Sequence, residues 1–146
     1  MTYNLYLIKL SNEDEFSDDI IDRDKLGYSE NMTQEEIYDS IRGYWRISEK
    51  SFEEADFFLG LAPEDESGRL FRIVMEIQPY NNSLTTVDED ESNNSGGKIK
   101  TDTKYFEGDI TNKTNLVSRV VQFNKPSQNR RLKMTSDELE QFIVEN

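Results

Sequence analysis

Residues 57–78 read FFLGLAPEDESGRLFRIVMEIQ, and this stretch decides the fold of the chain. Two apolar runs, 57–62 and 69–78, flank the segment 63–68, whose Pro, Asp and Gly residues supply the dihedral angles that turns require. In the second run the odd-numbered positions from 71 to 77 are all apolar, whereas polar residues lie among the even-numbered ones. The pattern predicts a β-hairpin whose second strand turns its odd-numbered side chains toward the core.

Short helices and further strands are predicted on both sides of this hairpin. Thr33, Ser51 and Thr135 are each followed three residues later by Glu, which is the capping-box pattern that opens a helix. Apolar patterning predicts additional strands at 2–10, 44–47, 104–108, 116–123 and 130–134. This mixed local order predicts an α+β fold with a curved, mixed or antiparallel, barrel-like sheet and about three short helices.

Length and charge set the broad class. A chain of 146 residues is most simply a single domain, 1–146. Its formal charge of −13, from 30 acidic and 17 basic residues, opposes loose binding to nucleic acid or to an anionic membrane and favours solubility. No apolar run approaches the roughly 20 residues that span a bilayer, and the N-terminus lacks the pattern of a signal peptide. We therefore expect a soluble, cytoplasmic protein with no membrane partner.

The chain contains no Cys and no His, which limits its chemistry. Disulfides, zinc sites of the usual ligand set, and Cys or Ser–His nucleophilic pairs are excluded within it. Asp65 followed by Glu76-Ile77-Gln78 faintly resembles the carboxylate pattern of metal-dependent nucleases, but Gln78 occupies the position of the Lys that positions water. We expect a non-catalytic protein with no catalytic residue, no metal and no cofactor.

Acidic residues are concentrated in residues 11–40, which carry 11 carboxylates against two basic side chains. Spaced carboxylates can form an ordinary solvated surface, or they can imitate a phosphate backbone and engage a basic protein groove. In the second case the partner-binding residues are Glu13, Asp14, Glu15, Asp18, Asp19, Asp22 and Asp24. A second polar segment, 81–103, is predicted to be a mobile insertion because it lacks the apolar content to offset its ordering entropy.

The only Trp lies in a short basic and aromatic motif, residues 41–47, with sequence IRGYWRI. Trp45 can stack on a base while Arg42 and Arg46 hold phosphates, or it can fill the core while both arginines reach solvent or local acids. The stretch 119–133 is the second basic feature, with five cations and no acid. It can form a phosphate-binding face, or it can pack against the acidic segment and be neutralised there. Both pairs of alternatives stay open.

The motif Arg42-Gly43-Tyr44-Trp45-Arg46-Ile47 and the hairpin 57–77 resemble a small bacterial domain, along residues 40–134 apart from the insertion. Tyr105-Phe106-Glu107-Gly108 and Ser127-Gln128-Asn129-Arg130 stand where that domain has an F-x-G strand and a turn before its last strand. The domain is similar to the PUA-like group (PUA, ASCH and EVE domains), whose members recognise RNA or modified bases in DNA. The resemblance implies a PUA-like barrel that occurs alone or beside nuclease modules, in defence or counter-defence systems of bacteria or phage.

Taken together, these features predict a recognition domain that binds nucleic acid, single-stranded or carrying a modified nucleobase. Its predicted ligand-binding residues are Arg42, Tyr44, Trp45, Arg46, Arg119, Gln128, Asn129, Arg130 and Arg131. The alternative is an acidic protein-interaction module, a nucleic-acid mimic or inhibitor of a basic nuclease or DNA-binding protein. Salt-sensitive binding of nucleic acid separates the two hypotheses.

Overall fold

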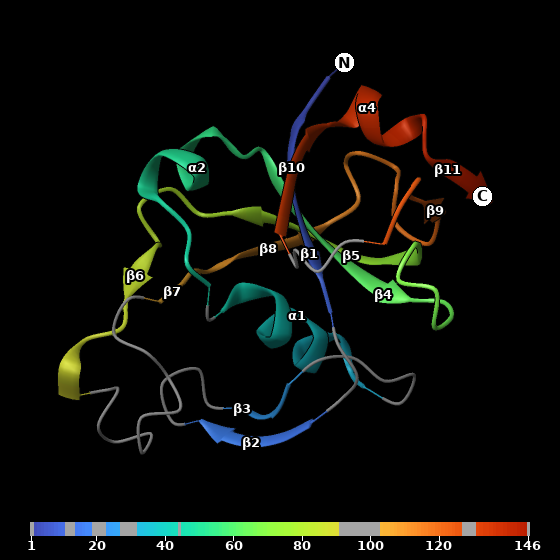
Figure 1. The fold of residues 1–146 in the computed structure, drawn as a ribbon. Coiled ribbons are helices and arrows are strands. Elements are labelled where there is room, and N and C mark those ends of the chain that lie inside the picture. The colour runs from blue at the N-terminus through green and yellow to red at the C-terminus, as the bar shows by residue number, and fades with distance from the viewer. Residues whose placement is uncertain are drawn as a thin grey trace.

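The computed structural model describes residues 2–10, 14–18, 23–26, 32–43, 45–90, 103–126 and 131–145, and for 14–18, 23–26 and 145 it describes the backbone alone. The strands are β1 Asn4–Lys9, β2 Asp14–Asp18, β3 Arg23–Leu26, β4 Phe57–Pro63, β5 Leu70–Pro79, β6 Thr85–Thr86, β7 Lys104–Tyr105, β8 Gly108–Thr111, β9 Val120–Gln122, β10 Arg131–Thr135 and β11 Ile143–Glu145. The helices labelled in Figure 1 are α1 Gln34–Arg42, α2 Glu49–Glu54 and α4 Ser136–Glu140.

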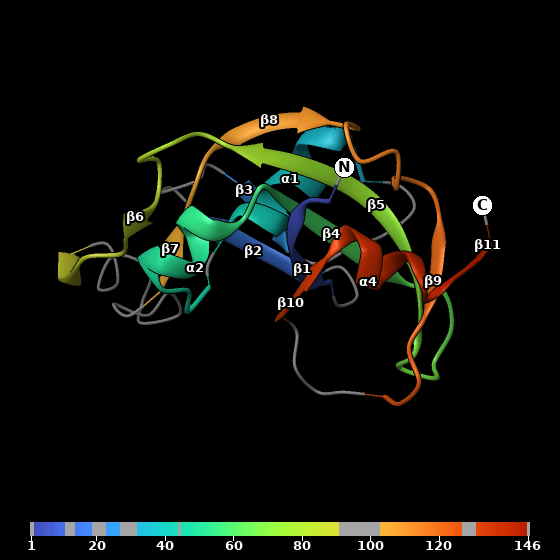
Figure 2. The same cartoon turned by 90° about the horizontal axis from the view of Figure 1, so that it is seen from above.

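A curled, mixed sheet forms a half-barrel in the described part of the chain (Figure 2). Its strand order is β10-β1-β4-β5-β9-β11, and β8 pairs with the far end of β5. β1 and β4 run parallel, whereas every other neighbouring pair in this sheet is antiparallel. α1 and α2 lie in the connection from β1 to β4, as expected for parallel strands, which need a long crossover.

The predicted hairpin is confirmed, because β4 and β5 pair antiparallel on either side of the turn at 64–69. The pairing contains one irregularity. Gly60 lies opposite Met75 and the next residue, Leu61, lies opposite Ile73, so Val74 is an extra residue on β5. Such a β-bulge breaks the alternation of side chains between the two faces of a strand. The prediction that all odd-numbered side chains of 69–78 share one face is therefore wrong.

The bulge separates β5 into two halves with opposite alternation. Phe71 and Ile73 belong to the core inside the curl, whereas Met75 and Ile77 belong to the core on the other face of the sheet. Glu76, which the sequence pattern had placed with the polar positions, consequently lies opposite the interior residue Leu59. It is fully buried. Simple alternation from the hairpin turn cannot predict this, because one inserted residue reverses every assignment beyond it.

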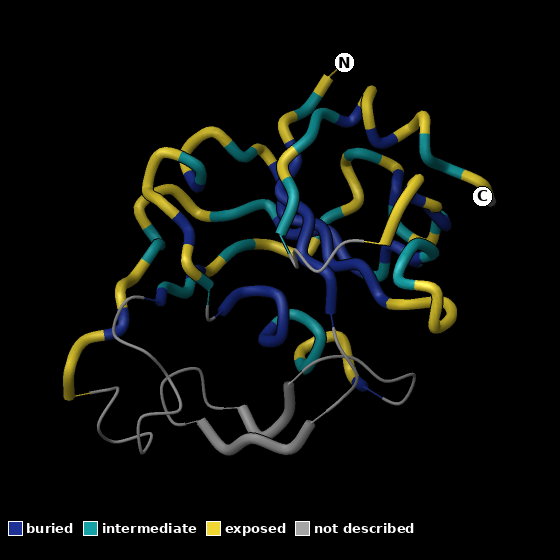
Figure 3. The backbone as a smooth tube through the Cα atoms, in the orientation of Figure 1, coloured by how far each residue is buried: buried dark blue, intermediate teal, exposed yellow. Residues whose placement is uncertain are grey.

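Two hydrophobic cores cover the two faces of the sheet, and the central strands are buried on both sides (Figure 3). The first core lies inside the curl and contains Leu5, Leu7, Phe57, Leu59, Leu61, Phe71, Ile73, Leu116, Val121, Phe123 and Leu139. The second core lies under α1 and α2 and contains Tyr6, Ile8, Leu10, Ile41, Ile47, Phe52, Phe58, Met75, Ile77 and Phe106. Alternate residues of β1 and β4 enter the two cores, as the two-residue period of a strand requires.

The helix starts follow local chemistry, with one correction. Thr33 and Thr135 both form complete capping boxes with the Glu three residues later, as predicted. The predicted start of α2 at Ser51 is wrong, because Ser48 is the N-cap and its side chain accepts a hydrogen bond from the Ser51 backbone N–H. α1 then packs closely on β4, where a Cβ added to Gly60 would lie 2.4 Å from Ile41 Cδ1.

Several predicted strands are shorter or interrupted. The predicted strand at 44–47 is reduced to a single bridge between Trp45 and Lys104, and that at 116–123 to β9. The strand predicted at 104–108 is two strands, β7 and β8. In the segment 81–103, residues 91–102 lie outside the described residues, whereas β6 pairs with β7 and Val87 is buried.

Candidate functional site

Arg42 is a structural residue in this fold. Its side chain is 11% exposed, and its guanidinium donates to the Phe106 carbonyl at 2.9 Å and to Asp39 at 3.3 Å. It also lies 3.8 Å from Glu107 and over the ring of Tyr38. A phosphate on Arg42 would have to displace these partners, so Arg42 does not belong to the candidate site.

Trp45 is half-buried at the margin of the second core. Its indole N–H donates to the Ile41 carbonyl at 2.6 Å, and its backbone exchanges two hydrogen bonds with Lys104. These contacts fix the chain direction immediately after α1, where Gly43 has an extended φ of 178°. The indole therefore serves the packing of the α1–α2 connection, and it places the exposed residue Arg46 at the surface.

The α1–α2 connection receives cations from distant parts of the chain. Lys104 of β7 donates from Nζ to the Ile47 carbonyl at 2.7 Å. Arg131 at the start of β10 donates to the carbonyl of Arg46. Both cations thus bond to neutral carbonyl oxygens, so neither of these hydrogen bonds neutralises the positive charge with a carboxylate.

Lys133, two residues further along β10, also bonds to a neutral oxygen of the α1–α2 region. Its Nζ donates to the Ser51 hydroxyl of α2 at 2.9 Å, and Ser51 belongs to the same short segment. Strand alternation places Arg131 and Lys133 on one face of β10, the face toward α2. We define the cationic cluster by its four members, Arg46, Lys104, Arg131 and Lys133.

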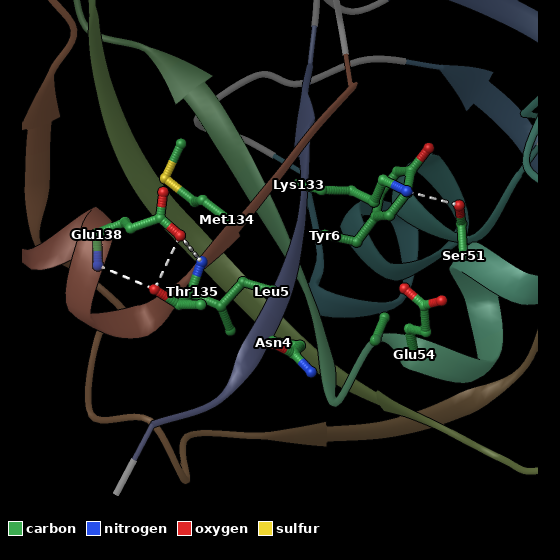
Figure 4. A pocket seen from close by; sticks show the side chains of 10 residues that line it. Asn4, Leu5, Tyr6, Ser51, Glu54, Lys133, Met134, Thr135 and Glu138 are labelled. Carbon is green, nitrogen blue, oxygen red and sulfur yellow. Dashed lines mark hydrogen bonds between the residues drawn. The ribbon is translucent and has the colours of Figure 1, made fainter.

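A hollow of about 250 Å³ lies beside this cluster, between α2 and the paired strands β1 and β10 (Figure 4). Figure 4 shows Tyr6, Lys133, Ser51 and Glu54 extending from three elements into the same region. The side chains offer hydrogen-bond donors at Lys133, an acceptor at Glu54 and the ring of Tyr6 as an apolar wall. Such a mixed lining suits a small planar ligand with both donors and acceptors.

Tyr6 joins the hollow to the cationic cluster. Burial raises the pKa of the Tyr6 phenol above its usual 10.0, and the nearby Arg131 guanidinium, which hydrogen-bonds to the phenol, acts in the opposite direction. The phenol is therefore protonated at neutral pH, and its oxygen accepts from the guanidinium. This contact helps to fix Arg131 over the second core.

Of the remaining predicted residues that the structure describes, Arg119 does not join this site. Arg119 precedes β9, and three strands, β1, β4 and β5, separate β9 from β10, so Arg119 lies apart from Arg131 and Lys133. Tyr44, Gln128, Asn129 and Arg130 lie outside the described residues. Sequence reasoning named Arg46 and Arg131 but missed Tyr6, Ser51 and Lys104, whose roles arise only from tertiary contacts.

The acidic alternative lies largely beyond the described side chains. Glu13, Asp19 and Asp22 are outside the described residues. The structure gives only a backbone for the other predicted carboxylates, which lie on the antiparallel strands β2 and β3: Asp14, Glu15, Asp18 and Asp24. The mimic hypothesis consequently stays a prediction.

Glu76 is the one buried carboxylate on the strand that faintly resembled a nuclease motif. Its Oε2 accepts from the Thr111 hydroxyl at 2.5 Å and from the Lys113 backbone N–H at 2.6 Å. Its Oε1 accepts from the Thr114 backbone N–H at 3.0 Å and from the Thr114 hydroxyl. All four contacts hold the 111–114 loop against the sheet, so Glu76 has a structural role.

Among the described side chains, no group of three or more acidic residues has the arrangement of a metal site. No helix in the described part of the chain is long and apolar enough to cross a membrane. Comparison of the sequence with models of protein families, with curated proteins and with solved structures gave no match.

Proposed function

We propose that this chain is a PUA-like recognition module that binds single-stranded nucleic acid, with phosphates on the cationic cluster and one base in the adjoining hollow. The observation that carries the proposal is the convergence of Lys104, Arg131 and Lys133 on residues 46–51. These cations come from two distant segments, and their hydrogen bonds go to carbonyl and hydroxyl oxygens. Segregated positive charge of this kind is the usual footprint of phosphate binding.

The net charge of −13 does not prevent a phosphate from binding to the cationic cluster, because electrostatic repulsion from distant carboxylates is screened. At physiological ionic strength the Debye length is about 8 Å, so acidic groups on other faces are largely screened from a phosphate at the cluster. Glu54 and Glu138 line the hollow itself, where they suit the hydrogen-bond donors of a base rather than a phosphate. Arg46 and Lys133 are exposed, whereas Lys104 and Arg131 are half-buried. Lys104 and Arg131 each keep N–H donors beyond the one that bonds to a carbonyl, so all four cations can donate to phosphate oxygens. The curled half-barrel with its helices in the β1–β4 crossover supports the PUA-like part of the proposal.

Fluorescence anisotropy with labelled single-stranded DNA tests the proposal. Each phosphate contact contributes about 0.7 to the slope of log K against log salt concentration for a single strand, so the four-cation cluster predicts a slope of roughly −3. Arg131→Gln and Lys133→Gln should each reduce the magnitude of this slope by about 0.7 and weaken binding. Circular dichroism of each variant checks that the fold is intact.

Arg119→Gln is the matched control, because it removes one positive charge near β9, and three strands separate β9 from β10. It should leave the salt slope unchanged. Absence of binding at low salt, or an equal effect of Arg119→Gln and Arg131→Gln, would refute the site. In either case the acidic-module hypothesis becomes the better account.

A further inference from the structure

A second hollow lies at the other side of the sheet, where the start of β5 meets β9 and the chain after α4. Its volume is about 420 Å³, within the range of small-molecule sites. Its lining includes Arg69, Gln122, Phe123, Asn124, Gln141 and Phe142. No member of the cationic cluster lines this hollow, so the hollow is independent of the proposed nucleic-acid site.

Backbone hydrogen bonds join the three segments that form the hollow. Phe123 N–H donates to the Arg69 carbonyl at 2.9 Å, and Gln122 N–H donates to the Phe142 carbonyl at 2.9 Å. The Phe123 and Phe142 rings also pack together, with centroids 5.3 Å apart. The wall is therefore a fixed part of the sheet, and a site on such a scaffold needs little reorganisation to bind a ligand.

Among the residues that the structure describes, the polar side chains of this wall form no hydrogen bonds of their own, although the Arg69 guanidinium interacts electrostatically with the exposed carboxylate of Asp65. Gln122, Asn124 and Gln141 are exposed, and Arg69 is half-buried. Within the described part of the chain, none of these four side chains hydrogen-bonds to another residue. One guanidinium and three primary amides thus lie around a single hollow whose lining includes no acidic residue.

The charge of this hollow contrasts with that of the whole chain. Arg69 is its one cation, and the Phe123 ring of its wall lies 5.4 Å from the Nζ of Lys9, a residue that is 6% exposed. Lys9 contacts the ring of Phe71 in the same way, at 5.3 Å. In a protein of charge −13, the absence of acids from the lining and two cations close by favour an anionic ligand.

We propose that this hollow binds a small organic acid, with its carboxylate on Arg69 and its aromatic or aliphatic body on the Phe123–Phe142 wall. The planar fork of an arginine matches a carboxylate through two parallel hydrogen bonds, which a lysine cannot reproduce. The amides of Gln122, Asn124 and Gln141 supply further donors to the carboxylate oxygens. The packed rings favour a flat apolar body through offset or edge contacts.

The experiment is a titration of the ¹⁵N-labelled full chain with 3-phenylpropionate, followed by two-dimensional NMR. The side-chain amide signals of Gln122, Asn124 and Gln141 should shift together and saturate. 3-Phenylpropanamide, which has the same shape without the charge, should bind about tenfold more weakly, the equivalent of one lost charged hydrogen bond. Phenyl phosphate is a further arm, and binding tighter than that of the carboxylate would overturn the assignment to an organic acid.

Arg69→Gln should weaken phenylpropionate binding about tenfold or more, and Arg69→Lys should recover only part of it. Arg119→Gln removes an equivalent charge that does not line the hollow and should leave the dissociation constant unchanged. Equal affinities for acid and amide, equal effects of the two charge-removing variants, or no saturable shift up to the solubility limit would each overturn the proposal. Loss of DNA binding in the cluster variants leaves this result unaffected, so the two proposals fail separately.

Discussion

Glu76→Gln is the substitution whose effect follows most directly from the structure. Glu76 is fully buried, and each of its carboxylate oxygens faces one hydroxyl and one backbone N–H of the 111–114 loop. A glutamine has one acceptor oxygen and one NH₂ group. A hydroxyl can rotate and accept from the NH₂ group, but a backbone N–H cannot. Either orientation of the amide therefore leaves Lys113 N–H or Thr114 N–H facing another donor.

The magnitude follows from these contacts. One unsatisfied backbone N–H costs about 1–3 kcal/mol, and the two bonds kept by the amide oxygen each weaken by about 1 kcal/mol when the acceptor loses its charge. Relief of the desolvation of a buried carboxylate offsets part of this sum. We expect a net loss of roughly 3 kcal/mol in the free energy of unfolding, which at a urea m-value of about 2 kcal/mol/M lowers the midpoint by roughly 1.5 M.

The assay is urea unfolding at neutral pH, followed by the fluorescence of Trp45 and by far-ultraviolet circular dichroism. Coincident transitions establish two-state behaviour, which the comparison requires. Glu66→Gln in the exposed turn between β4 and β5 is the matched control and should change stability by less than about 0.5 kcal/mol. If Glu76→Gln shifts the midpoint no more than Glu66→Gln does, the carboxylate does not hold the loop, and the structural role assigned to it is wrong.

Two further predictions test the packing and the charges. Gly108→Ala should destabilise the protein by about 1–3 kcal/mol, because the added Cβ would lie 2.4 Å from the Gln78 carbonyl oxygen. Gly60→Ala should lower the free energy of unfolding by less in the same urea experiment, because the atom nearest to its added Cβ, Ile41 Cδ1, ends a flexible side chain. Burial lowers the pKa of Lys9 in the folded protein below its usual value of 10.5. At pH values between the lowered pKa and 10.5, the unfolded chain therefore binds more protons than the folded one. The contribution of Lys9 to the free energy of unfolding rises with pH in this window. The difference in unfolding free energy between wild type and Lys9→Met should rise across that window, and a flat difference contradicts this account.

Local patterns predicted those elements whose defining contacts are close in sequence. The capping boxes at Thr33 and Thr135 join residues three apart, and both form. The hairpin 57–78 was predictable because its two apolar runs are connected by a short turn, where Gly68 adopts a positive φ of 74°. Ser48 illustrates the limit of this approach, since Ser48 and Ser51 both precede suitable residues and the sequence alone does not select between them.

The sites depended on contacts that no local pattern contains. Arg42 and Arg46 flank the same Trp, yet one is buried against Asp39 and the other is exposed. Arg42 lies in the last turn of α1, on the side that faces Asp39, whereas Arg46 lies beyond the helix in the α1–α2 connection. Similarly, the stretch 119–133 appeared to be one basic face. The sheet order places three strands between β9 and β10, so Arg119 before β9 and Arg131 in β10 do not lie side by side.

The sequence by itself determined the limits that composition sets on this protein, the hairpin, and the helix caps at Thr33 and Thr135. These depend on residue type and on interactions within a few positions. The tertiary structure decided the rest. The bulge at Val74 reversed the alternation of β5 and buried Glu76. The cationic cluster joins residues separated by 57, 82 and 85 positions, through Lys104, Lys133 and Arg131 respectively. The physical reason is that sheet pairing and packing on both faces, which act between distant segments, fix which side chains share a surface.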